Sequence, residues 1–336
     1  MTITAKTKLV KAETVKKFLL KKNLYDNRYL IQKEGFFIYF PIKKKVGVVG
    51  AEVVQKNLSK IPSSKNLRLA LSKKLSKNEL TNLIRSYDVI GTIAILNIPN
   101  ELEKKEEIIA KEVLKLNKNI KTVLKKLGIH SGEFRTQKLK WLVGEKTKEA
   151  LYKENGILIQ FDLEKVYFSM RLSTERKRIS QQIKTSERVL VMFSGCAPYA
   201  LVISKNSKAK EIYGVEKNRV AHNYGLKNIK LNKIININLL CGDVKKVIPK
   251  LNKKFDRVLM PLPKSAENFL ELIPLVSKKG TTIHFYTFGT EKDVKTIKSM
   301  IKKKLPNTRI LRTVKCGNYS PSVFRLCIDF KITSLK

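Results

Sequence analysis

Four apolar, strand-like runs in the second half of the chain each end on a short loop, and these loop residues could hold a cofactor that carries a nucleoside. The second run ends on Glu216, an acid that can accept hydrogen bonds from both hydroxyls of a ribose. In an open α/β sheet, ligands bind in the crevice beyond the carboxyl ends of the strands. The four ends therefore form one candidate site, and the runs cover residues 188–198, 211–216, 238–243 and 256–263.

Helical stretches separate these runs, which predicts the arrangement that brings their ends together. They lie at 218–231, 265–277 and 291–304. Strands that alternate with helices imply right-handed crossovers and a mainly parallel sheet. Residues 309–315 and 323–330 are joined by too few residues for a helical crossover, so we expect them to pair antiparallel. The predicted fold class is α/β, a mainly parallel sheet that ends in an antiparallel hairpin.

The first sixty residues read as a small unit. A helical pattern covers 10–22, and residues 29–31 and 36–40 read as short strands. The polar stretch at 59–65 is the best linker candidate in the chain, which places a domain boundary near it.

The middle region reads as a mixed platform of helices and strands rather than a nucleotide fold. Residues 88–96 and 156–161 are strand-like, and residues 101–127 form a long, highly charged helical pattern. We therefore predict three domains, at residues 1–60, 61–180 and 181–336.

The charge of the chain favours a polyanionic partner. Seventy Lys and Arg residues against 28 Asp and Glu residues leave a formal net charge of +42 over 336 residues. Such an excess attracts nucleic acid through phosphate neutralisation and counterion release. The alternative is the lysine-rich composition of a heat-adapted organism, but that composition is normally balanced by Glu. We therefore predict that the partner is RNA or DNA.

The cysteines and histidines predict neither disulfides nor a metal site. The four cysteines are far apart and form no C-x-x-C pair, so we expect buried free thiols in a reducing compartment. His130, His222 and His284 lack metal-ligand spacing, and we read His284 as a strand residue. No metal is expected in the chemical step.

The amino-terminal residues lack the apolar segment of a signal peptide. No apolar run approaches the roughly 20 residues that are needed to cross a bilayer. We therefore expect a soluble, cytoplasmic protein.

Several motifs between residues 130 and 290 resemble those of one enzyme family. The most specific is Val166-Tyr-Phe-Ser-Met-Arg-Leu-Ser-Thr-Glu-Arg176. The others are Gly132-Glu-Phe-Arg135, Glu154-Asn-Gly156, Met192-Phe-Ser-Gly195, Asp256-Arg-Val-Leu-Met-Pro-Leu-Pro263 and Ile283-His-Phe-Tyr286. With the predicted sheet, they make the chain similar to the class I S-adenosylmethionine methyltransferases. More specifically, the chain resembles the archaeal and eukaryotic tRNA guanosine-37 N1-methyltransferases.

This resemblance implies the cofactor, the partner and the organisation of the protein. The cofactor is S-adenosyl-L-methionine, and the partner is tRNA, bound at its anticodon loop and outer corner. A small amino-terminal module contacts the outer corner, a middle domain binds RNA, and the last domain is catalytic. The resemblance also suggests a monomer.

Methylation of guanosine N1 requires a general base that removes the N1 proton and a donor that stabilises charge at O6. Glu175 resembles the family's base, and Arg135 resembles the residue that binds O6. Two alternatives stay open. Glu175 also fits the first turn of a helix, where an acid is favourable, and Arg135 also fits a phosphate contact.

The remaining cofactor contacts are expected at the strand ends and just before the first strand. The turn after the first strand should let the backbone approach the methionine part. Asp243 is placed for the adenine amino group, although it also suits a helix N-cap. The residues expected to bind the cofactor are Arg176, Phe193, Gly195, Glu216, Lys217, Asp243, Val244 and Pro261.

The substrate contacts are expected near the fourth strand and in the arginine cluster. Arg171 and Arg178 could meet either a cofactor carboxylate or a tRNA phosphate. The residues assigned to substrate binding are Arg171, Arg178, Met260, Pro261, Leu262 and Pro263.

Three positions depart from the family pattern. Val191 replaces an Asp and Ala197 replaces a loop Gly, which predicts weaker cofactor binding or compensation elsewhere. Pro261 replaces an Asn and leaves carbonyls such as that of Met260 to meet the guanine edge. Pro261 also resembles a subgroup whose members methylate C7 of a tricyclic guanosine derivative, 4-demethylwyosine, to give isowyosine in tRNA-Phe.

Two other functions compete with the leading one. Relatives that share the fold transfer the aminocarboxypropyl group of the same cofactor to the wyosine precursor, but Glu175 and Arg135 argue against that reaction. A tRNA-binding protein that has lost the cofactor is the non-enzymatic alternative. It would have no reason to keep Glu216 and Asp243 in their expected places.

Overall fold

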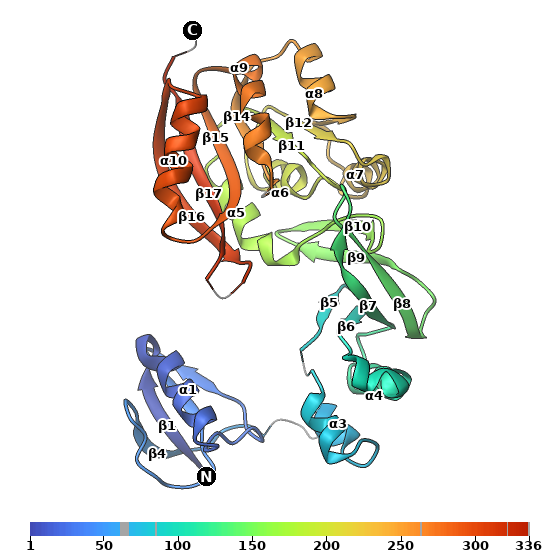
Figure 1. Ribbon diagram of the computed structural model, residues 1–336, viewed down its shortest axis with the longest axis vertical. Coiled ribbons are helices and arrows are strands. Elements are labelled where there is room, and N and C mark those ends of the chain that lie inside the picture. The colour runs from blue at the N-terminus through green and yellow to red at the C-terminus, as the bar shows by residue number, and fades with distance from the viewer. Residues whose placement is uncertain (61–66, 85, 263, 321, 335–336) are drawn as a thin grey trace. The chain divides into compact units, whose positions relative to one another are not determined.

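The computed structural model describes residues 1–60, 67–84, 86–262, 264–320 and 322–334. The chain forms two compact units (Figure 1). One consists of Met1–Arg85 with Pro99–Lys118, and the other of Ser86–Ile98 with Asn119–Lys336. The three predicted domains and their boundaries stay predictions, and most of the predicted linker lies outside the described residues.

The first unit begins with a small antiparallel sheet against which one helix packs. Ala5, Val15, Leu19 and Phe40 are buried in its core. The strand order is β2-β3-β1-β4. The elements are β1 (Thr2–Lys8), α1 (Ala12–Lys21), β2 (Gln32–Glu34), β3 (Phe37–Pro41) and β4 (Glu52–Lys56).

The sequence predictions for this sheet are partly right. The predicted helix and the strand at 36–40 are confirmed. The strand predicted at 29–31 is wrong, because pairing with β3 begins only at Gln32. β1 was missed because threonines such as Thr4 and Thr7, on opposite faces of the strand, supply much of its buried surface, so its hydrophobic alternation is weak.

Among the described residues, four helical segments follow this sheet in the first unit, and one of them corrects a prediction. The helical pattern at 101–127 forms a helix only as far as Leu116, and residues from Thr122 onward form a strand. Asn117 and Asn119 are poor helix formers, and the following residues pair with two neighbouring strands. The segments are α2 (Leu67–Leu71), α3 (Lys77–Asn82), η3 (Asn100–Lys105) and α4 (Glu106–Leu116).

The second unit starts with a four-stranded sheet of order β5-β6-β7-β8. The single strand predicted at 88–96 is wrong, because Gly91 turns it into a hairpin. Gly91 has φ +59°, and a Cβ atom there would lie 2.2 Å from the carbonyl oxygen of Leu151. The strands are β5 (Asp88–Ile90), β6 (Ile93–Leu96), β7 (Thr122–Ser131) and β8 (Thr136–Gly144).

A separate hairpin follows, made of β9 (Glu149–Glu154) and β10 (Ile157–Asp162). Its turn residues Asn155 and Gly156 both have positive φ, as an Asn-Gly hairpin turn requires. The strand predicted just after Asn155 is confirmed. The 3-10 helix η4 (Met170–Leu172) and helix α5 (Ser173–Ser180) follow, and α5 carries the end of the most specific sequence motif.

Over the part of the chain that the structure describes, seven strands form the large sheet, in the order β13-β12-β11-β14-β15-β17-β16. The first five are parallel, and β17 runs antiparallel to both of its neighbours. The predicted fold class is therefore confirmed. The strands are β11 (Arg188–Met192), β12 (Glu211–Glu216), β13 (Ile237–Cys241), β14 (Phe255–Met260), β15 (Ser277–Gly289), β16 (Thr308–Asn318) and β17 (Phe324–Ile332).

Helices cover both faces of this sheet (Figure 1). The helices predicted at 218–231 and 291–304 are confirmed, whereas the one at 265–277 is two short segments. The segments are α6 (Pro198–Asn206), α7 (Arg219–Leu231), α8 (Val244–Val247), η6 (Ala266–Leu272), α9 (Ile273–Val276) and α10 (Asp293–Lys304).

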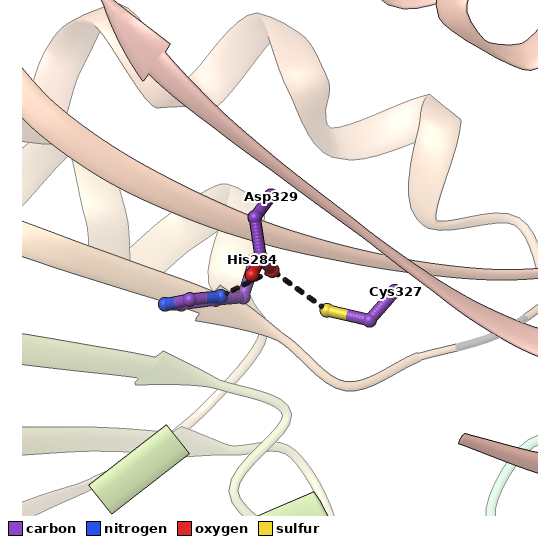
Figure 2. Close-up of side chains that lie close together, drawn as sticks. All are labelled: His284, Cys327 and Asp329. Atoms are coloured by element: carbon purple, nitrogen blue, oxygen red, sulfur yellow. Dashed lines mark hydrogen bonds and ion pairs between the residues drawn. The ribbon is translucent and has the colours of Figure 1, made fainter. Parts of the chain in front are cut away.

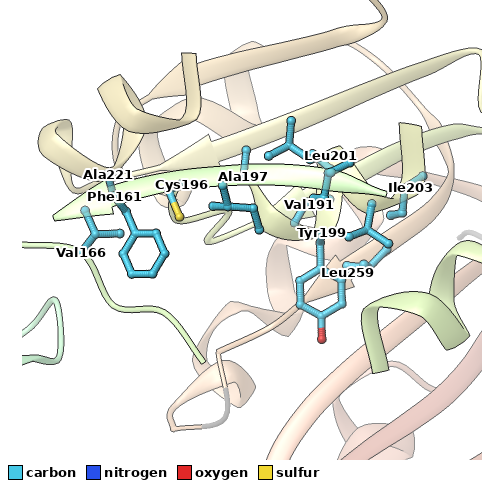
Figure 3. Packing of buried hydrophobic residues seen from close by; sticks show 14 of the residues in the cluster. Phe161, Val166, Val191, Cys196, Ala197, Tyr199, Leu201, Ile203, Ala221 and Leu259 are labelled. Carbon is cyan, nitrogen blue, oxygen red and sulfur yellow. The ribbon is translucent and has the colours of Figure 1, made fainter. Parts of the chain in front are cut away.

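Strand β11 is buried on both faces. Val189 and Val191 pack into one hydrophobic cluster, and Leu190 and Met192 pack into the other, as expected for a strand between two helical layers. Figure 3 shows Val191 among the cluster that also contains Tyr199 and Leu259. Strand β11 is therefore held by packing on both faces and by its pairing with β12 and β14.

All four cysteines are free, as predicted, but they are not all buried. Cys196 and Cys327 are buried, whereas Cys241 is exposed and Cys316 is intermediate. Among the described residues, the structure contains no helix that is both long and apolar enough to cross a membrane.

Candidate functional site

A cavity of about 390 Å³ opens at the carboxyl ends of β11, β12, β13 and β14, and we call it the first cavity. All eight residues expected to bind the cofactor line it, so the structure brings the four predicted strand ends together. These lining residues are Arg176, Phe193, Gly195, Glu216, Lys217, Asp243, Val244 and Pro261.

The loop after β11 has an unusual backbone. Phe193, Gly195 and Ala197 all have positive φ, at 57°, 57° and 69°. The left-handed region costs a non-glycine residue about 1–2 kcal/mol. The Phe193 ring packs edge-on against Phe269, with ring centroids 4.9 Å apart. Ala197 thus adopts a left-handed conformation that favours glycine, at a cost in strain.

Glu216 lies at the centre of the first cavity's polar wall. Its carboxylate accepts the backbone N–H of Gly195 and that of Asn218, each at 2.7 Å. Burial raises the pKa of Glu216, and these backbone hydrogen bonds oppose the rise. An ionised carboxylate has about four acceptor positions, so each oxygen can still accept one more hydrogen bond. That leaves the capacity needed for two vicinal hydroxyls.

Asp243 caps a helix and also lines the first cavity. Its side chain accepts the backbone N–H of Lys245 at 2.9 Å and so caps α8, and it also lines the first cavity. Lys217 lies 3.1 Å from Asp243 and 2.6 Å from Glu133. The hydrogen bond from Lys245 and the nearby Lys217 lower the pKa of Asp243, so it is ionised at neutral pH. Buried Val244 adds apolar surface beside it.

Arg176 is fully buried at the wall of the first cavity. It forms a two-point ion pair with Glu154 of β9, and its Nη2 also donates to the carbonyl of Ser169 at 3.1 Å. This contact explains the Glu154-Asn-Gly motif, to which the sequence assigned no role. The partners lie 22 residues apart, so no local spacing could have revealed the pair. Glu154 positions Arg176 and joins the β9–β10 hairpin to α5.

Glu175 does not line the first cavity, nor the second cavity that is described below. Its carboxylate is buried and accepts two hydrogen bonds from Arg178 and one from the Tyr286 hydroxyl, each at 2.6 Å. Three of its acceptor positions are thus used, and one on Oε2 remains. Tyr286 belongs to the Ile283-His-Phe-Tyr286 motif, which thereby gains a structural role.

Arg178 is also kept away from the cavities. Besides Glu175, it contacts Asp329 of β17 at 2.9 Å. Burial lowers the pKa of Arg178, but its two carboxylate partners outweigh burial and raise it. With its guanidinium committed to two acids, Arg178 is not placed to contact a substrate, and we do not retain it as a substrate-binding residue.

Arg135 lies in the turn between β7 and β8 and borders two cavities. Its guanidinium lies 5.1 Å from the centre of the Tyr167 ring. Its Nη1 atom is buried and, within the described residues, has no hydrogen-bond partner. An unpaired buried donor is costly unless a ligand accepts from it. Arg135 thus lies at the first cavity, and its Nη1 atom there is a donor from which no described residue accepts.

The other cavity bordered by Arg135, which we call the second cavity, also has a volume of about 390 Å³. Arg171 lines it, with a side chain that is 77% exposed and an ion pair with Asp88 at 3.6 Å. The two cavities share the residues Arg135, Tyr167, Phe168, Ser169 and Leu172.

The residues after β14 lie where the sequence placed them. Pro261 and Leu262 line the first cavity. Met260 is buried and lines neither cavity, and its carbonyl accepts the N–H of Leu262 at 2.8 Å. Pro263 lies outside the described residues.

His284, Cys327 and Asp329 form a buried cluster (Figure 2). Arg257 donates to Nε2 of His284 at 2.8 Å, so Nδ1 carries the proton and donates to Asp329 at 2.6 Å. Burial lowers the pKa of His284, which favours this neutral form. Arg178 and Arg312 balance the charge of Asp329. Because three guanidinium groups surround the cluster, it is a hydrogen-bonded core and not a suitable metal site.

Three family models match successive parts of the chain. Residues 6–49 match the tRNA methyltransferase 5 N-terminal domain, residues 67–147 match the TYW2 N-terminal domain, and residues 150–310 match the TRM5/TYW2 methyltransferase domain. The last match contains the first cavity's strand ends and the Glu175 motif.

Curated relatives match nearly the whole chain. The Trm5b tRNA (guanine(37)-N(1))-methyltransferase of Pyrococcus abyssi is 34% identical over 99% of this chain and 100% of its own. The Trm5b enzyme of Methanocaldococcus jannaschii is 36% identical, covering 95% of this chain and 96% of its own. A Nanoarchaeum equitans enzyme, the tRNA (guanine(37)-N(1))/4-demethylwyosine(37)-methyltransferase Taw22, is 33% identical over 70% of this chain and 93% of its own.

Solved structures agree. The crystal structure of P. abyssi Trm5b has a TM-score of 0.71 and 33% identity, covering 99% of this chain and 100% of that one. The complex of aTrm5 with tRNALeu has a TM-score of 0.70 and 34% identity, covering 98% and 100%. Fold, cavity and comparisons agree with the resemblance in the motifs: the chain belongs to the Trm5 family of tRNA (guanine(37)-N(1))-methyltransferases.

Proposed function

We propose that this protein transfers a methyl group from S-adenosylmethionine to N1 of guanosine 37 in tRNA. The observation that carries the proposal is the first cavity, in which Glu216, Asp243 and the loop after β11 converge at the carboxyl ends of four parallel strands. Trm5b relatives that match the chain almost end to end are named for this reaction.

The residues of the first cavity fit S-adenosylmethionine. Glu216 keeps one free acceptor position on each oxygen for the ribose hydroxyls. Phe269 and Val244 offer apolar surface to the adenine ring, next to Asp243. The hydroxyl of Ser194 is buried in the wall and has no partner in the described part of the chain. When bound, the cofactor supplies an electrophilic methyl group on a sulfonium sulfur.

Arg135 and Glu175 would act on different atoms of the guanine base. Arg135 would donate its unpaired Nη1–H to O6 of guanine, where negative charge develops as N1 loses its proton. Glu175 would accept that proton at its remaining acceptor position on Oε2, but it lines neither cavity. Activity therefore requires the buried Glu175 carboxylate to move toward the cavity when RNA binds.

The charge and the first unit fit a tRNA substrate. A net charge of +42 suits extended contact with phosphates. Residues 6–49 match a domain of tRNA methyltransferase 5, and we propose that they contact the outer corner of the tRNA while the second unit holds the anticodon loop. We also expect a monomer in the cytoplasm.

A second activity, methylation of C7 in the tricyclic base 4-demethylwyosine, is favoured by Pro261. Pro261 has neither a side-chain donor nor a backbone N–H, so it cannot donate a hydrogen bond that would make the first cavity specific for the polar edge of guanine. The Nanoarchaeum relative is named for both substrates. Incubation with tRNA that carries the demethylated tricycle tests this activity: no methyl incorporation, alongside normal guanosine methylation, would reject it.

The competing functions give different products. A Methanocaldococcus aminocarboxypropyltransferase is 31% identical over 73% of this chain, which is a weaker match than that of the Trm5b enzymes. Its reaction would add a larger mass to the base than a methyl group. An inactive tRNA-binding protein would fail to bind S-adenosylmethionine in calorimetry while still binding tRNA.

The test of the main proposal is nucleoside mass spectrometry. The protein is incubated with S-adenosylmethionine and an unmodified tRNA transcript that has guanosine at position 37. We expect 1-methylguanosine at that position, and none in a matched transcript with adenosine there. Absence of the product while both cofactor and tRNA bind would overturn the proposal.

A further inference from the structure

The second cavity contains a second guanidinium with one unpaired nitrogen atom, that of Arg325 in β17. Its Nε atom is buried and has no hydrogen-bond partner within the described ranges. Its Nη2 donates to the Tyr167 hydroxyl at 3.3 Å, which is long for a hydrogen bond. Arg135, with its own unpaired Nη1, lines the same cavity. A buried charged donor without an acceptor is destabilising, so this pair indicates a ligand.

The charges around the second cavity specify an anion. Its one acid, Asp88, is neutralised by Lys126 at 2.7 Å and by Arg171 at 3.6 Å. Arg135 and Arg325 have no such acidic partner among the lining residues. The cavity is therefore left with net positive charge, which is the requirement for a phosphate group.

Aromatic rings stand beside these cations. The Phe288 and Tyr319 rings lie 4.3 Å apart, and the Arg325 guanidinium lies 5.4 Å from the centre of Phe288. Tyr319 is 55% exposed although it lines the cavity. It belongs to the loop of the terminal hairpin, between β16 and β17. Exposed aromatic rings next to arginines are the usual platform for unstacked bases.

The position of the second cavity separates its ligand from the methylated base. It adjoins the first cavity through Arg135 and Tyr167, but none of the loop residues at the ends of β11 to β14 lines it. The methyl acceptor must reach the cofactor in the first cavity. An RNA chain continues on either side of that acceptor, and the adjoining cavity is where a neighbouring nucleotide would lie.

We propose that the second cavity binds a nucleotide of the substrate RNA next to the methylated one. Arg325 donates to its phosphate, and Phe288 and Tyr319 stack on its base. This inference rests on the proposed function, because it takes RNA to be the substrate. It assigns a binding role to the terminal hairpin of the large sheet.

The test compares Arg325→Met with Arg309→Met. Arg309 lies in the same hairpin, is exposed and lines neither cavity, so its replacement removes the same charge without touching the site. We expect Arg325→Met to raise the KM for tRNA about ten-fold or more. It should also lower the slope of log binding constant against log salt by about one, the amount expected for one lost phosphate contact. Cofactor affinity should be unchanged.

Two further variants protect the test from a folding artefact. Arg325→Lys keeps the charge, so it should restore the salt slope but only part of the affinity, because lysine lacks the forked donor geometry. Tyr319→Leu, at an exposed loop position, should weaken RNA binding about five-fold or more through loss of stacking. Unchanged KM values for tRNA in both Arg325→Met and Tyr319→Leu would overturn the inference.

Direct binding to an anticodon stem-loop RNA separates this inference from the proposed function. If the wild type makes no methylated product but Arg325→Met still weakens stem-loop binding relative to Arg309→Met, the subsite stands and the proposed reaction falls. If the wild type methylates tRNA and Arg325→Met binds the stem-loop as Arg309→Met does, the subsite falls and the reaction stands.

Discussion

At the scale of single residues, the charged groups of the first cavity are fixed by the protein before any ligand binds. Arg176 is held by Glu154, and Glu216 is held by two backbone N–H groups. Such fixed groups need little rearrangement when the cofactor enters, which favours tight and well-oriented binding. Glu175 is fixed as well, but its partners hold it outside this cavity.

The pair of Glu154 and Arg176 gives the first prediction. Glu154→Ala leaves a buried guanidinium without its acid, which should lower the free energy of unfolding by about 3–5 kcal/mol. Urea unfolding measures this loss. Glu107→Ala is the matched control, because Glu107 pairs with Lys111 on the surface and should contribute less than about 1 kcal/mol. Equal effects of the two variants would show that the buried pair contributes nothing special.

Glu216 gives a prediction on pH. Burial raises its pKa above the usual value of 4.5. Its protonated form is therefore favoured in the folded protein, and this contribution to stability is lost as the pH rises through the raised pKa. Ribose hydroxyls need the ionised form as acceptor, so affinity for S-adenosylmethionine should fall as the pH drops through the same range.

Calorimetry between about pH 5 and pH 8 measures this dependence. Glu216→Gln cannot ionise, so its affinity should be weaker at neutral pH and nearly constant with pH. If the affinity of the wild type for S-adenosylmethionine were equally constant with pH, the Glu216 carboxylate would not contact the cofactor.

At the scale of elements, the strands and helices that hold the site follow from local pattern, and the exceptions have physical causes. β11 to β14 were predictable because apolar runs alternate with helical stretches. The end of α4 was not, because the charged pattern continues past Asn117 while pairing with β6 and β8 draws the next residues into β7. The residues of the site likewise fall into those that local sequence pattern predicts and those that it does not. Strand-end residues such as Glu216 were predictable, whereas the hydrogen bond from Tyr286 that helps to enclose Glu175 spans 111 residues of chain.

The β5–β6 hairpin gives a prediction at this scale. Gly91 and Gly128 both have positive φ, but a Cβ at Gly91 would strike the Leu151 carbonyl, whereas a Cβ at Gly128 would meet nothing within 4 Å. Gly128→Ala should therefore cost only the backbone strain of about 1–2 kcal/mol. Gly91→Ala should cost clearly more, because backbone of the neighbouring hairpin must move. Thermal unfolding compares them, and equal costs would contradict the close packing of these strands.

At the scale of the whole molecule, the main question is whether the charge of +42 serves RNA binding or reflects composition alone. The second cavity argues for binding, because its unpaired arginines face a concave, aromatic-lined site rather than open solvent. Lysines spread over the surface would contribute to RNA binding only if they contact phosphates of the RNA.

Salt dependence decides between these alternatives. Each phosphate that the protein neutralises releases counterions, so contact with six to ten phosphates should weaken tRNA binding by roughly 10³–10⁵-fold between 50 and 200 mM salt. Filter binding of the full chain to tRNA measures this, with S-adenosylmethionine affinity at the same salts as the control. Because the cofactor contacts lie inside the first cavity, they should be far less sensitive to screening. A tRNA affinity that changes no more than the cofactor affinity would assign the excess of lysine to composition.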